Sequence, residues 1–464
     1  MTDAMTTVAL AKAIAQGELS ALQATQECMA RIEAGDAAVN AFTGRTFERA
    51  LREAQAIDTL RGRGAPLPAL AGVPYAVKNL FDVQGEVTLA GSKINRSHSP
   101  ASADAVLVAQ MQRAGAILVG MLNMDEYAYG FTTENTHYGP TRNPHDVRCV
   151  AGGSSGGSGA AVAAGMVGLT LASDTNGSIR VPASFCGVWG LKPTFGRLSR
   201  RGTYPFVHSI DHLGPLADSV EGLALSYDAL QTPDPLDPAC HAQRIQPVLP
   251  VLGRGIEGLR IGRLGDYFDD FSTPPAMQAA ASAASTLNAR ATVLWPDAAV
   301  ARAAAFITTA SEGGRLHLAD LRKKAQDFEP LSVDRFIAGA LQPAAWYLRA
   351  QHFRRMYRER VLALFQDWDV VVAPATPVCA PPIGTQWLHI QGQQLPSRAS
   401  IGLLTQPISF AGCPVVTAPL WPDGTGGMPI GVQLIAAPWR EDLALRAARV
   451  LQDAGVARLQ PVVV

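Results

Sequence analysis

Residues 151–192 read AGGSSGGSGAAVAAGMVGLTLASDTNGSIRVPASFCGVWGLK, and the rest of the chain is organised around this stretch. It opens on a run of glycine and serine, passes through small apolar residues, and closes on a second turn, Asp174-Thr175-Asn176-Gly177-Ser178. Glycine is placed where a backbone takes conformations that other residues avoid, or approaches another group closely. We expect a strand and a helix to bring the two turns, each with a serine hydroxyl, to one spot, which we interpret as an active site.

Several common motifs do not fit this stretch. No lysine follows Gly157 or Gly159, as a P-loop requires, and Val162 stands where a dinucleotide fingerprint has its last glycine. The hydrolase elbow G-x-S-x-G is absent around both Ser154 and Ser178, and the nine histidines are too scattered for a metal site. A purely structural glycine-rich turn would explain one such loop but explains two less well.

The remaining interpretation is a serine nucleophile with a lysine as its base. A serine hydroxyl is a weak nucleophile until another group removes its proton. Residues 70–78 form a short apolar run that ends in Lys78. Considered alone, such a lysine reaches solvent; in a site it is a desolvated base with a lowered pKa. The turn at 174–178 adds backbone N–H groups, which stabilise the oxyanion of acyl transfer.

Apolar runs and helical periodicities alternate along the rest of the chain, which predicts an α/β protein with helices covering a largely buried sheet. Buried strands are expected at 70–78, 116–120, 168–172, 259–264, 369–374, 415–419 and 430–435. Helices are expected within 6–34 and at 46–60, 103–114, 219–230, 275–290 and 441–454, and through most of 298–368 with a break at Gly313-Gly314.

Composition bounds the class of protein. The chain has 464 residues, 48% of them hydrophobic, and its 39 basic and 39 acidic residues give a net charge of zero. This balance gives no electrostatic argument for nucleic acid or a membrane surface as partner. The six cysteines form no C-x-x-C pair, and the N-terminal residues show no secretory signal. We expect a soluble cytoplasmic protein.

The two turns, together with Lys78, resemble the amidase signature family. The resemblance runs over nearly the whole chain and implies a single domain at 1–464 with a central mixed β-sheet covered by helices on both faces. Within it we expect N-terminal helices (1–65), a signature core (66–220), a helical substrate-side region (221–368) and a C-terminal sheet and helix (369–464).

The resemblance also assigns roles to residues. It implies amide hydrolysis in which Ser178 is the nucleophile, Ser154 is a bridging serine preceded by a cis peptide bond, and Lys78 is the general base. It implies no cofactor and no metal. The oxyanion hole would consist of the backbone N–H groups of Thr175, Asn176, Gly177 and Ser178. The supporting residues would be Ser155, Asp174 and Arg180, the last two as a structural ion pair.

Asn176 departs from the usual Asp-Thr-Gly-Gly-Ser turn, and because asparagine tolerates left-handed geometry we expect the turn to survive. A branch of the family that releases ammonia from small urea-derived amides has this turn, and its enzyme partners a small helical subunit, so a hetero-oligomer is implied. The alternatives are the glutamine-hydrolysing subunit of a tRNA-dependent amidotransferase, another small-amide hydrolase (for allophanate, malonamate or biuret), and a non-catalytic assembly subunit. Candidates for binding substrate are Tyr127, Tyr129 and His317, with Arg315 and Arg322 as further possibilities.

Overall fold

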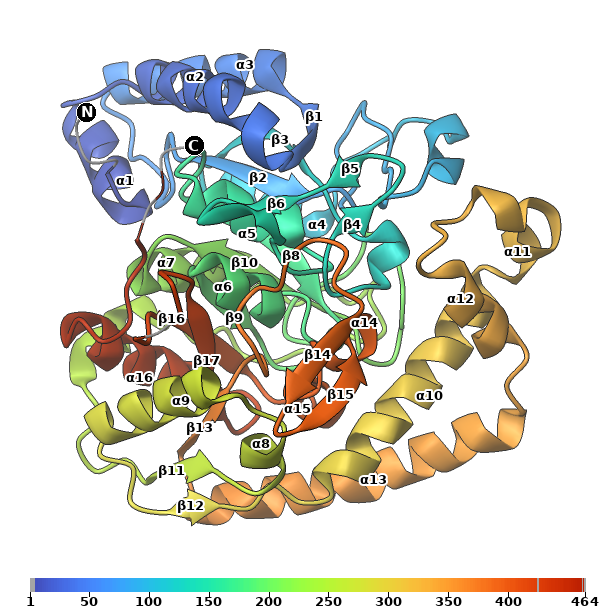
Figure 1. The fold of residues 1–464 in the computed structure, drawn as a ribbon. Helices are drawn as coiled ribbons and strands as arrows, with labels where there is room; N and C mark the ends of the chain where they lie inside the picture. The colour runs from blue at the N-terminus through green and yellow to red at the C-terminus, as the bar shows by residue number, and fades with distance from the viewer. Residues whose placement is uncertain (1–4, 424, 461, 463–464) are drawn as a thin grey trace.

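A mixed β-sheet of eleven strands crosses the part of the chain that the computed structural model describes, residues 5–423, 425–460 and 462 (Figure 1). In their order across the sheet the strands are β1 (Phe42–Arg45), β3 (Ile117–Leu122), β2 (Pro74–Lys78), β8 (Leu169–Asp174), β10 (His212–Ala217), β9 (Trp189–Lys192), β16 (Val415–Leu420), β17 (Ile430–Ala436), β13 (Val370–Pro374), β11 (Ile261–Leu264) and β12 (Thr292–Val293). Three small hairpins pair β4 (Glu134–Asn135) with β5 (Gly139–Pro140), β6 (Arg142–Asn143) with β7 (Asp146–Val150), and β14 (Trp387–Ile390) with β15 (Gln393–Pro396).

The helices surround this sheet. They are α1 (Thr7–Gln16), α2 (Ala21–Val39), α3 (Phe47–Gly62), α4 (Val106–Arg113), α5 (Gly156–Ala163), α6 (Arg180–Cys186), α7 (Val220–Leu230), α8 (Tyr267–Asp270), α9 (Pro274–Thr286), α10 (Ala298–Leu316), α11 (Leu318–Lys324), α12 (Val333–Ala340), α13 (Ala344–Asp367), α14 (Ser397–Ser400), α15 (Gln406–Ala411) and α16 (Glu441–Asp453). Short 3₁₀ turns lie at Ile94–Ser97, Glu126–Ala128, Leu249–Arg254 and Ala325–Asp327.

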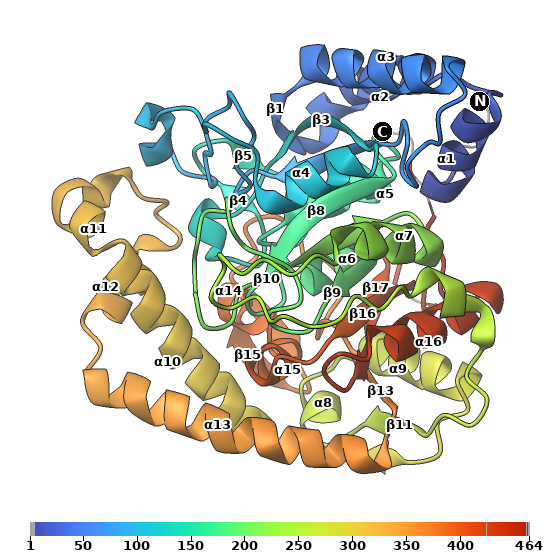
Figure 2. The same cartoon turned by 180° about the vertical axis from the view of Figure 1, so that it is seen from behind.

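Both faces of the sheet are buried, and β2 shows how. Tyr75 and Val77 point into one apolar cluster with Leu107 of α4 and Leu223 of α7, whereas Ala76 points into a second cluster with α2, α3 and α5. Successive side chains of a strand face opposite sides, so a strand covered by helices on both sides reads as a continuous apolar run. Figures 1 and 2 show α2 and α3 along one end of the sheet and α16 and α9 along the other.

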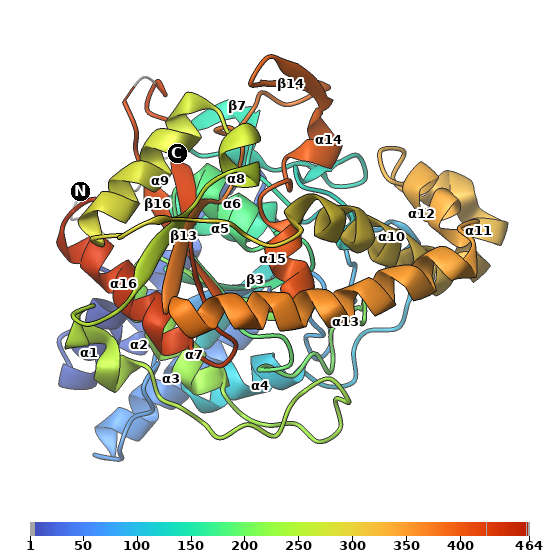
Figure 3. The same cartoon turned by 90° about the horizontal axis from the view of Figure 1, so that it is seen from below.

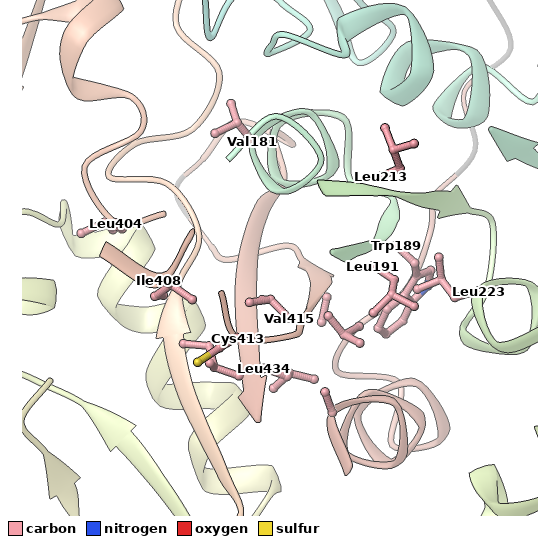
Figure 4. Packing of buried hydrophobic residues seen from close by; sticks show 14 of the residues in the cluster. Val181, Trp189, Leu191, Leu213, Leu223, Leu404, Ile408, Cys413, Val415 and Leu434 are labelled. Carbon is pink, nitrogen blue, oxygen red and sulfur yellow. The ribbon is translucent and has the colours of Figure 1, made fainter. Parts of the chain in front are cut away.

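The N-terminal and C-terminal halves of the chain share one core. β9 pairs with β16, and the fully buried side chains of Trp189 and Leu191 pack near Val415 and Leu434 from the C-terminal strands (Figure 4). A large aromatic residue at this junction buries much apolar area. The two halves are therefore joined by apolar packing as well as by strand pairing.

The long helices α10 and α13 lie along one side of the molecule and carry α11 and α12 beyond the sheet (Figures 1 and 3). The predicted break at Gly313-Gly314 is wrong, because α10 runs through both residues. The glycines serve close packing instead: a Cβ on Gly314 would lie 2.6 Å from the carbonyl carbon of Gly339 on α12. Absence of a side chain lets the two helices touch backbone to backbone.

The α/β class with a mixed sheet and helices on both faces is confirmed, and each predicted strand overlaps a strand of the sheet. The sequence did not indicate β10, because Gly214 and Pro215 interrupt its apolar pattern and proline is unusual inside a sheet. Among the described residues, none of the helices has the length and apolar character needed to cross a membrane.

Candidate active site

Three parallel strands end at one edge of the sheet, and the predicted catalytic residues lie there. β2 pairs in parallel with β3 on one side and with β8 on the other. Lys78 ends β2, Asp125 follows β3 closely, and Ser173 and Asp174 end β8. The carboxyl ends of parallel strands meet at one edge of a sheet. Side chains from three separate segments therefore converge without long loops.

Lys78 is fully buried, and its amine contacts two serine hydroxyls. Nζ donates to Oγ of Ser154 over 2.7 Å and to Oγ of Ser173 over 2.9 Å. Burial lowers the pKa of Lys78 to about 7, although the negative charges of Asp125 and Asp174 act in the opposite direction. An ammonium group removed from water loses its hydration, which favours the neutral amine. At neutral pH a substantial fraction of Lys78 is therefore able to accept a proton from a serine.

Ser154 lies in a loop that packs against Asp125. The peptide bond between Gly153 and Ser154 is cis, which confirms that prediction. A Cβ on Gly153 would collide with the Asp125 carboxylate, so this position requires glycine. Thr133 fixes the surroundings, because its N–H donates to Oδ2 of Asp125 over 3.0 Å and its hydroxyl donates to the carbonyl of Gly152 over 2.9 Å. The loop thus holds the Ser154 hydroxyl towards Lys78.

The Asp174 carboxylate organises the turn that ends on Ser178. It accepts the N–H of Gly177 over 2.8 Å and that of Ile179 over 3.1 Å. Gly177 has φ of +140°, and a Cβ there would lie 2.9 Å from the Cβ of Thr405, so both geometry and space require glycine. The bond to Asp174 also removes the Gly177 N–H from the four donors expected to line the oxyanion hole.

The turn accommodates Asn176, as predicted, but not through left-handed geometry. The positive φ of this turn falls on Gly177, so a tolerance for left-handed geometry does not account for the asparagine. Instead the side-chain amide of Asn176 donates to Oγ1 of Thr309 on α10 over 2.8 Å. The backbone carbonyl of Asn176 accepts a hydrogen bond from the Thr405 hydroxyl over 2.6 Å. Asn176 therefore links the catalytic turn to the helical region.

Arg180 and Asp174 form the expected ion pair, and both side chains are fully buried. Nε and Nη2 of Arg180 each lie 3.0 Å from a carboxylate oxygen of Asp174, and Nη1 donates to Oε1 of Gln433 over 2.7 Å. Burial alone would raise the pKa of Asp174, but the charge and hydrogen bonds of Arg180 hold it below its usual range. The pair stabilises the turn and ties it to β17.

A narrow cavity opens beside Ser178, with Tyr129, Arg335 and Arg398 in its lining. Arg335 belongs to α12, and its Cζ atom lies 5.5 Å from the centroid of the Tyr129 ring. Its guanidinium forms no ion pair with any residue that the structure describes. Arg398, from α14, has Nη2 at 3.9 Å from Oδ1 of Asp125. The nucleophile candidate thus shares a small enclosed space with two cations.

Of the three residues predicted to bind substrate, the structure places one in the lining of this cavity. Tyr129 lines the cavity, whereas Tyr127 and His317 belong to an aromatic cluster outside its lining, with ring centroids 4.0 Å apart. The Tyr127 hydroxyl donates to Oδ1 of Asn95 over 3.1 Å. Burial lowers the pKa of His317 to about 4, so its ring is neutral at physiological pH. His317 therefore offers no positive charge to a carboxylated substrate.

Several residues at the site were missed from the sequence. Ser173 contacts the amine of Lys78 directly, and the Ser155 hydroxyl donates to the Ser173 carbonyl over 3.2 Å. The position of Ser173 at the end of a strand beside β2 was a usable signal. Arg335 and Arg398 carried none, because no motif surrounds them and the chain has 39 basic residues.

Comparison with known proteins agrees with this geometry. Residues 23–445 match the amidase family. AtzE, the 1-carboxybiuret hydrolase component from Pseudomonas sp. (strain ADP), is 69% identical over 456 residues, which cover 98% of this chain and 100% of that protein. A glutamyl-tRNA(Gln) amidotransferase component from Synechococcus sp. (strain WH7803) is 35% identical over 471 residues, 95% of each chain. A solved structure of an s-triazine catabolic enzyme, described as a vestigial protein complex, has a TM-score of 0.98 and 69% identity, and covers 98% of this chain and 100% of that one.

The chain belongs to the amidase family, as its two glycine-rich turns predicted, and it is a hydrolase of amide C–N bonds.

Proposed function

We propose that this chain hydrolyses 1-carboxybiuret, with release of ammonia, in cyanuric acid and s-triazine catabolism. The identity with AtzE over almost the entire chain supports this substrate. One structural feature carries the proposal: Arg335, a half-buried guanidinium without an ion-pair partner among the described residues, lines the same cavity as Ser178. Withdrawal of a cation from water is costly unless an anion compensates it. The planar guanidinium fork suits a carboxylate.

In the proposed reaction Ser178 is the nucleophile and Lys78 is the base. The neutral amine of Lys78 accepts the proton of the Ser154 hydroxyl while Ser154 accepts the proton of Ser178. The freed Ser178 oxygen attacks the terminal carbamoyl carbon. The resulting oxyanion accepts hydrogen bonds from the backbone N–H groups of Thr175, Asn176 and Ser178, because that of Gly177 is already bonded.

Collapse of this intermediate breaks the C–N bond. Lys78 returns its proton through Ser154 to the leaving nitrogen, ammonia departs, and the carbonyl remains as an ester on Ser178. Water then gives a proton to the same relay and attacks the ester carbon. The proton passes back to the Ser178 oxygen as the product leaves with a new carboxylate. In the part of the chain that the structure describes, Ser178 makes no hydrogen bond to Ser154; such contacts often tighten only with substrate bound.

The size of the cavity restricts the substrate. It holds about 20 Å³, room for about one water molecule. A substrate of a few linked amide units is therefore admitted only when side chains around it, Arg335 and Arg398 among them, move outward. A small planar acid requires less movement than a bulky acyl group, which favours the proposed class of substrate.

A small helical partner subunit belongs to the proposal. The similar s-triazine enzyme is described in a protein complex. Eleven large apolar side chains are exposed within 294–362, and we propose this region as the surface that the partner covers. They are Leu294, Val300, Leu316, Leu318, Leu331, Ile337, Leu341, Trp346, Leu348, Met356 and Leu362.

The proposed function is tested by ammonia release from 1-carboxybiuret, biuret, allophanate, malonamate and glutamine, with and without co-purified partner. We expect 1-carboxybiuret to be the preferred substrate and Ser178→Ala to abolish its turnover while the protein stays folded. Ser158→Ala is the matched control, a buried serine of α5 outside the relay, and it should keep its activity. Ammonia from glutamine with none from 1-carboxybiuret would overturn the proposal in favour of an amidotransferase component. Unchanged turnover in Ser178→Ala would overturn the mechanism.

A further inference from the structure

A second cavity is lined in part by Ser173, which contacts the amine of Lys78. It has a volume of about 190 Å³, and its lining includes Leu80, Ser173, Thr175, Asp211 and Leu213. Ser173 is the residue whose hydroxyl accepts a hydrogen bond from Nζ of Lys78. The inner end of this cavity is therefore one side chain away from the proposed base, whereas the cavity with the two arginines reaches Ser178.

The two cavities share a thin wall. Ala128, Thr175 and Phe206 line both of them. Thr175 is held in place because its hydroxyl donates to Oδ1 of Asp211 over 2.6 Å, and Oδ2 of Asp211 accepts the backbone N–H groups of Phe206 and Val207 over 3.0 Å and 2.9 Å. The hydrogen bonds of Asp211 thus hold the wall in place. The acyl carbon of a Ser178 ester would lie on one side of this wall and the second cavity on the other.

The chemistry of the second cavity suits small neutral molecules. The two arginines at its rim are paired, Arg200 with Asp237 at 3.2 Å and Arg201 with Asp234 at 2.9 Å, so they do not offer free charge to an anion. Leu80, Phe206 and Leu213 supply apolar walls, and Ser173, Thr175 and Thr203 add hydroxyl groups. A cavity of this size holds several water molecules. Ammonia and water can pass along such walls. The product of the proposed reaction, which carries two carboxylates, would find no unpaired cation among these two arginines.

We propose that this second cavity is the passage through which ammonia leaves and the hydrolytic water arrives, while the acyl part of the substrate stays with Arg335 and Arg398. This inference rests on the proposed function. The leaving nitrogen takes its proton from the Lys78–Ser154 relay, and the incoming water gives a proton to the same relay. Both molecules are therefore needed on the side of the acyl carbon that faces Lys78, which is where the second cavity ends.

The passage is tested with hydroxylamine as an acyl acceptor that competes with water. Attack of its nitrogen on the Ser178 ester gives an N-hydroxyurea and frees the serine, whereas attack of water gives the acid. Thr203→Trp and Leu236→Trp narrow the passage; Leu236 is 70% exposed at the rim, so that variant does not disturb the core. Leu60→Trp, at a 38% exposed position on α3 outside both cavities, is the matched control.

We expect the ratio of N-hydroxyurea to acid to fall at least threefold in both passage variants, because hydroxylamine is larger than water. The KM for 1-carboxybiuret should stay within twofold of the wild-type value, and the control should change neither quantity. An unchanged ratio in the folded Leu236→Trp variant, or a fall accompanied by an equal rise in KM, would overturn the inference. Failure of the wild-type protein to release ammonia from 1-carboxybiuret would instead count against the proposed function.

Discussion

Lys78 and Lys192 show that the partners of a buried lysine, and not its burial, decide what it can do. Burial lowers the pKa of each to about 7. The amine of Lys192 donates to the backbone carbonyls of Pro193 and Cys413, which have no proton to give. The amine of Lys78 faces two hydroxyls. A serine can pass on a proton, so we propose that the same kind of perturbed amine serves catalysis at Lys78 and structure at Lys192.

The pH dependence of the rate follows from Lys78. The base must be neutral, and its pKa is about 7, so kcat/KM should rise with pH through about 7 to a plateau. Lys78→Met should lower kcat by roughly 10²–10⁴, the usual contribution of a general base. Ammonia release measured from pH 5.5 to 9.5 checks this. Lys192→Met, if folded, should keep the wild-type profile, and a profile that follows Lys192 instead of Lys78 would contradict the assignment.

Removal of Arg180 should destabilise the protein strongly. Arg180→Met leaves the Asp174 carboxylate buried without its counter-ion, which costs about 3–5 kcal/mol of unfolding free energy. Urea unfolding followed by far-UV circular dichroism measures the loss. Arg148→Met is the control, because Arg148 pairs with Asp146 at the surface with 84% of its side chain exposed and should give no measurable change. Equal stability of the two variants would show that the buried pair is dispensable.

At the scale of elements, the contact between α10 and α12 places Arg335. α12 approaches α10 so closely that a Cβ on Gly339 would collide with the backbone of Ala310. Arg335 lies one turn before this glycine on the same helix. The position of the guanidinium in the cavity therefore depends on a glycine that touches no substrate.

Gly339→Ala should push α12 away from α10 and weaken recognition of the substrate carboxylate. We expect KM to rise about tenfold, equivalent to roughly 1.4 kcal/mol of binding, with a smaller change in kcat because the relay is untouched. Gly62→Ala on α3, where a Cβ would meet nothing within 4 Å, is the matched helical control and should leave KM unchanged. Loss of kcat at constant KM would place the effect of Gly339 in the chemistry and not in recognition.

Features that leave a local pattern in the sequence were predictable, and features that arise only from tertiary packing were not. The strands were predictable because burial on both faces leaves continuous apolar runs, and Ser154 and Ser178 were predictable because backbone geometry forces glycine around them. Arg335 and Arg398 were not predictable, because only tertiary packing brings these two exposed-looking residue types to Ser178. The sequence singled out Asn176, but the bond that its side chain makes to Thr309 was not predictable, because the two residues are far apart in the sequence.

At the scale of the whole molecule, the sheet makes the two halves of the chain interdependent. β9 pairs with β16, and Arg180 bonds to the carbonyl of Thr405 and to Gln433. We therefore propose that residues 1–464 fold as one domain. The helical region 294–362 completes the cavity and does not form a core of its own.

Cleavage of the chain between its halves should test this interdependence. The connection at 231–240 includes Leu236, which is 70% exposed, so the chain is accessible to a break there. Residues 1–236 expressed alone should fail to fold cooperatively, because β9 lacks β16 and Arg180 lacks its C-terminal partners. Co-expression with residues 237–464 should restore ammonia release. A cooperative unfolding transition of the N-terminal fragment alone would contradict the single-domain proposal.

The division of labour within the active site has a consequence for how such enzymes diversify. The proposed proton relay comes from residues 78–178, whereas the arginines of the cavity come from α12 and α14, more than a hundred and fifty residues later. Mutation of Arg335 should therefore alter which acyl group is admitted and leave Lys78, Ser154 and Ser178 in place. Exchange of residues 298–400 between homologues should therefore transfer much of the specificity, provided that the exchanged segment keeps a hydroxyl at position 309 to bond with Asn176 of the catalytic turn.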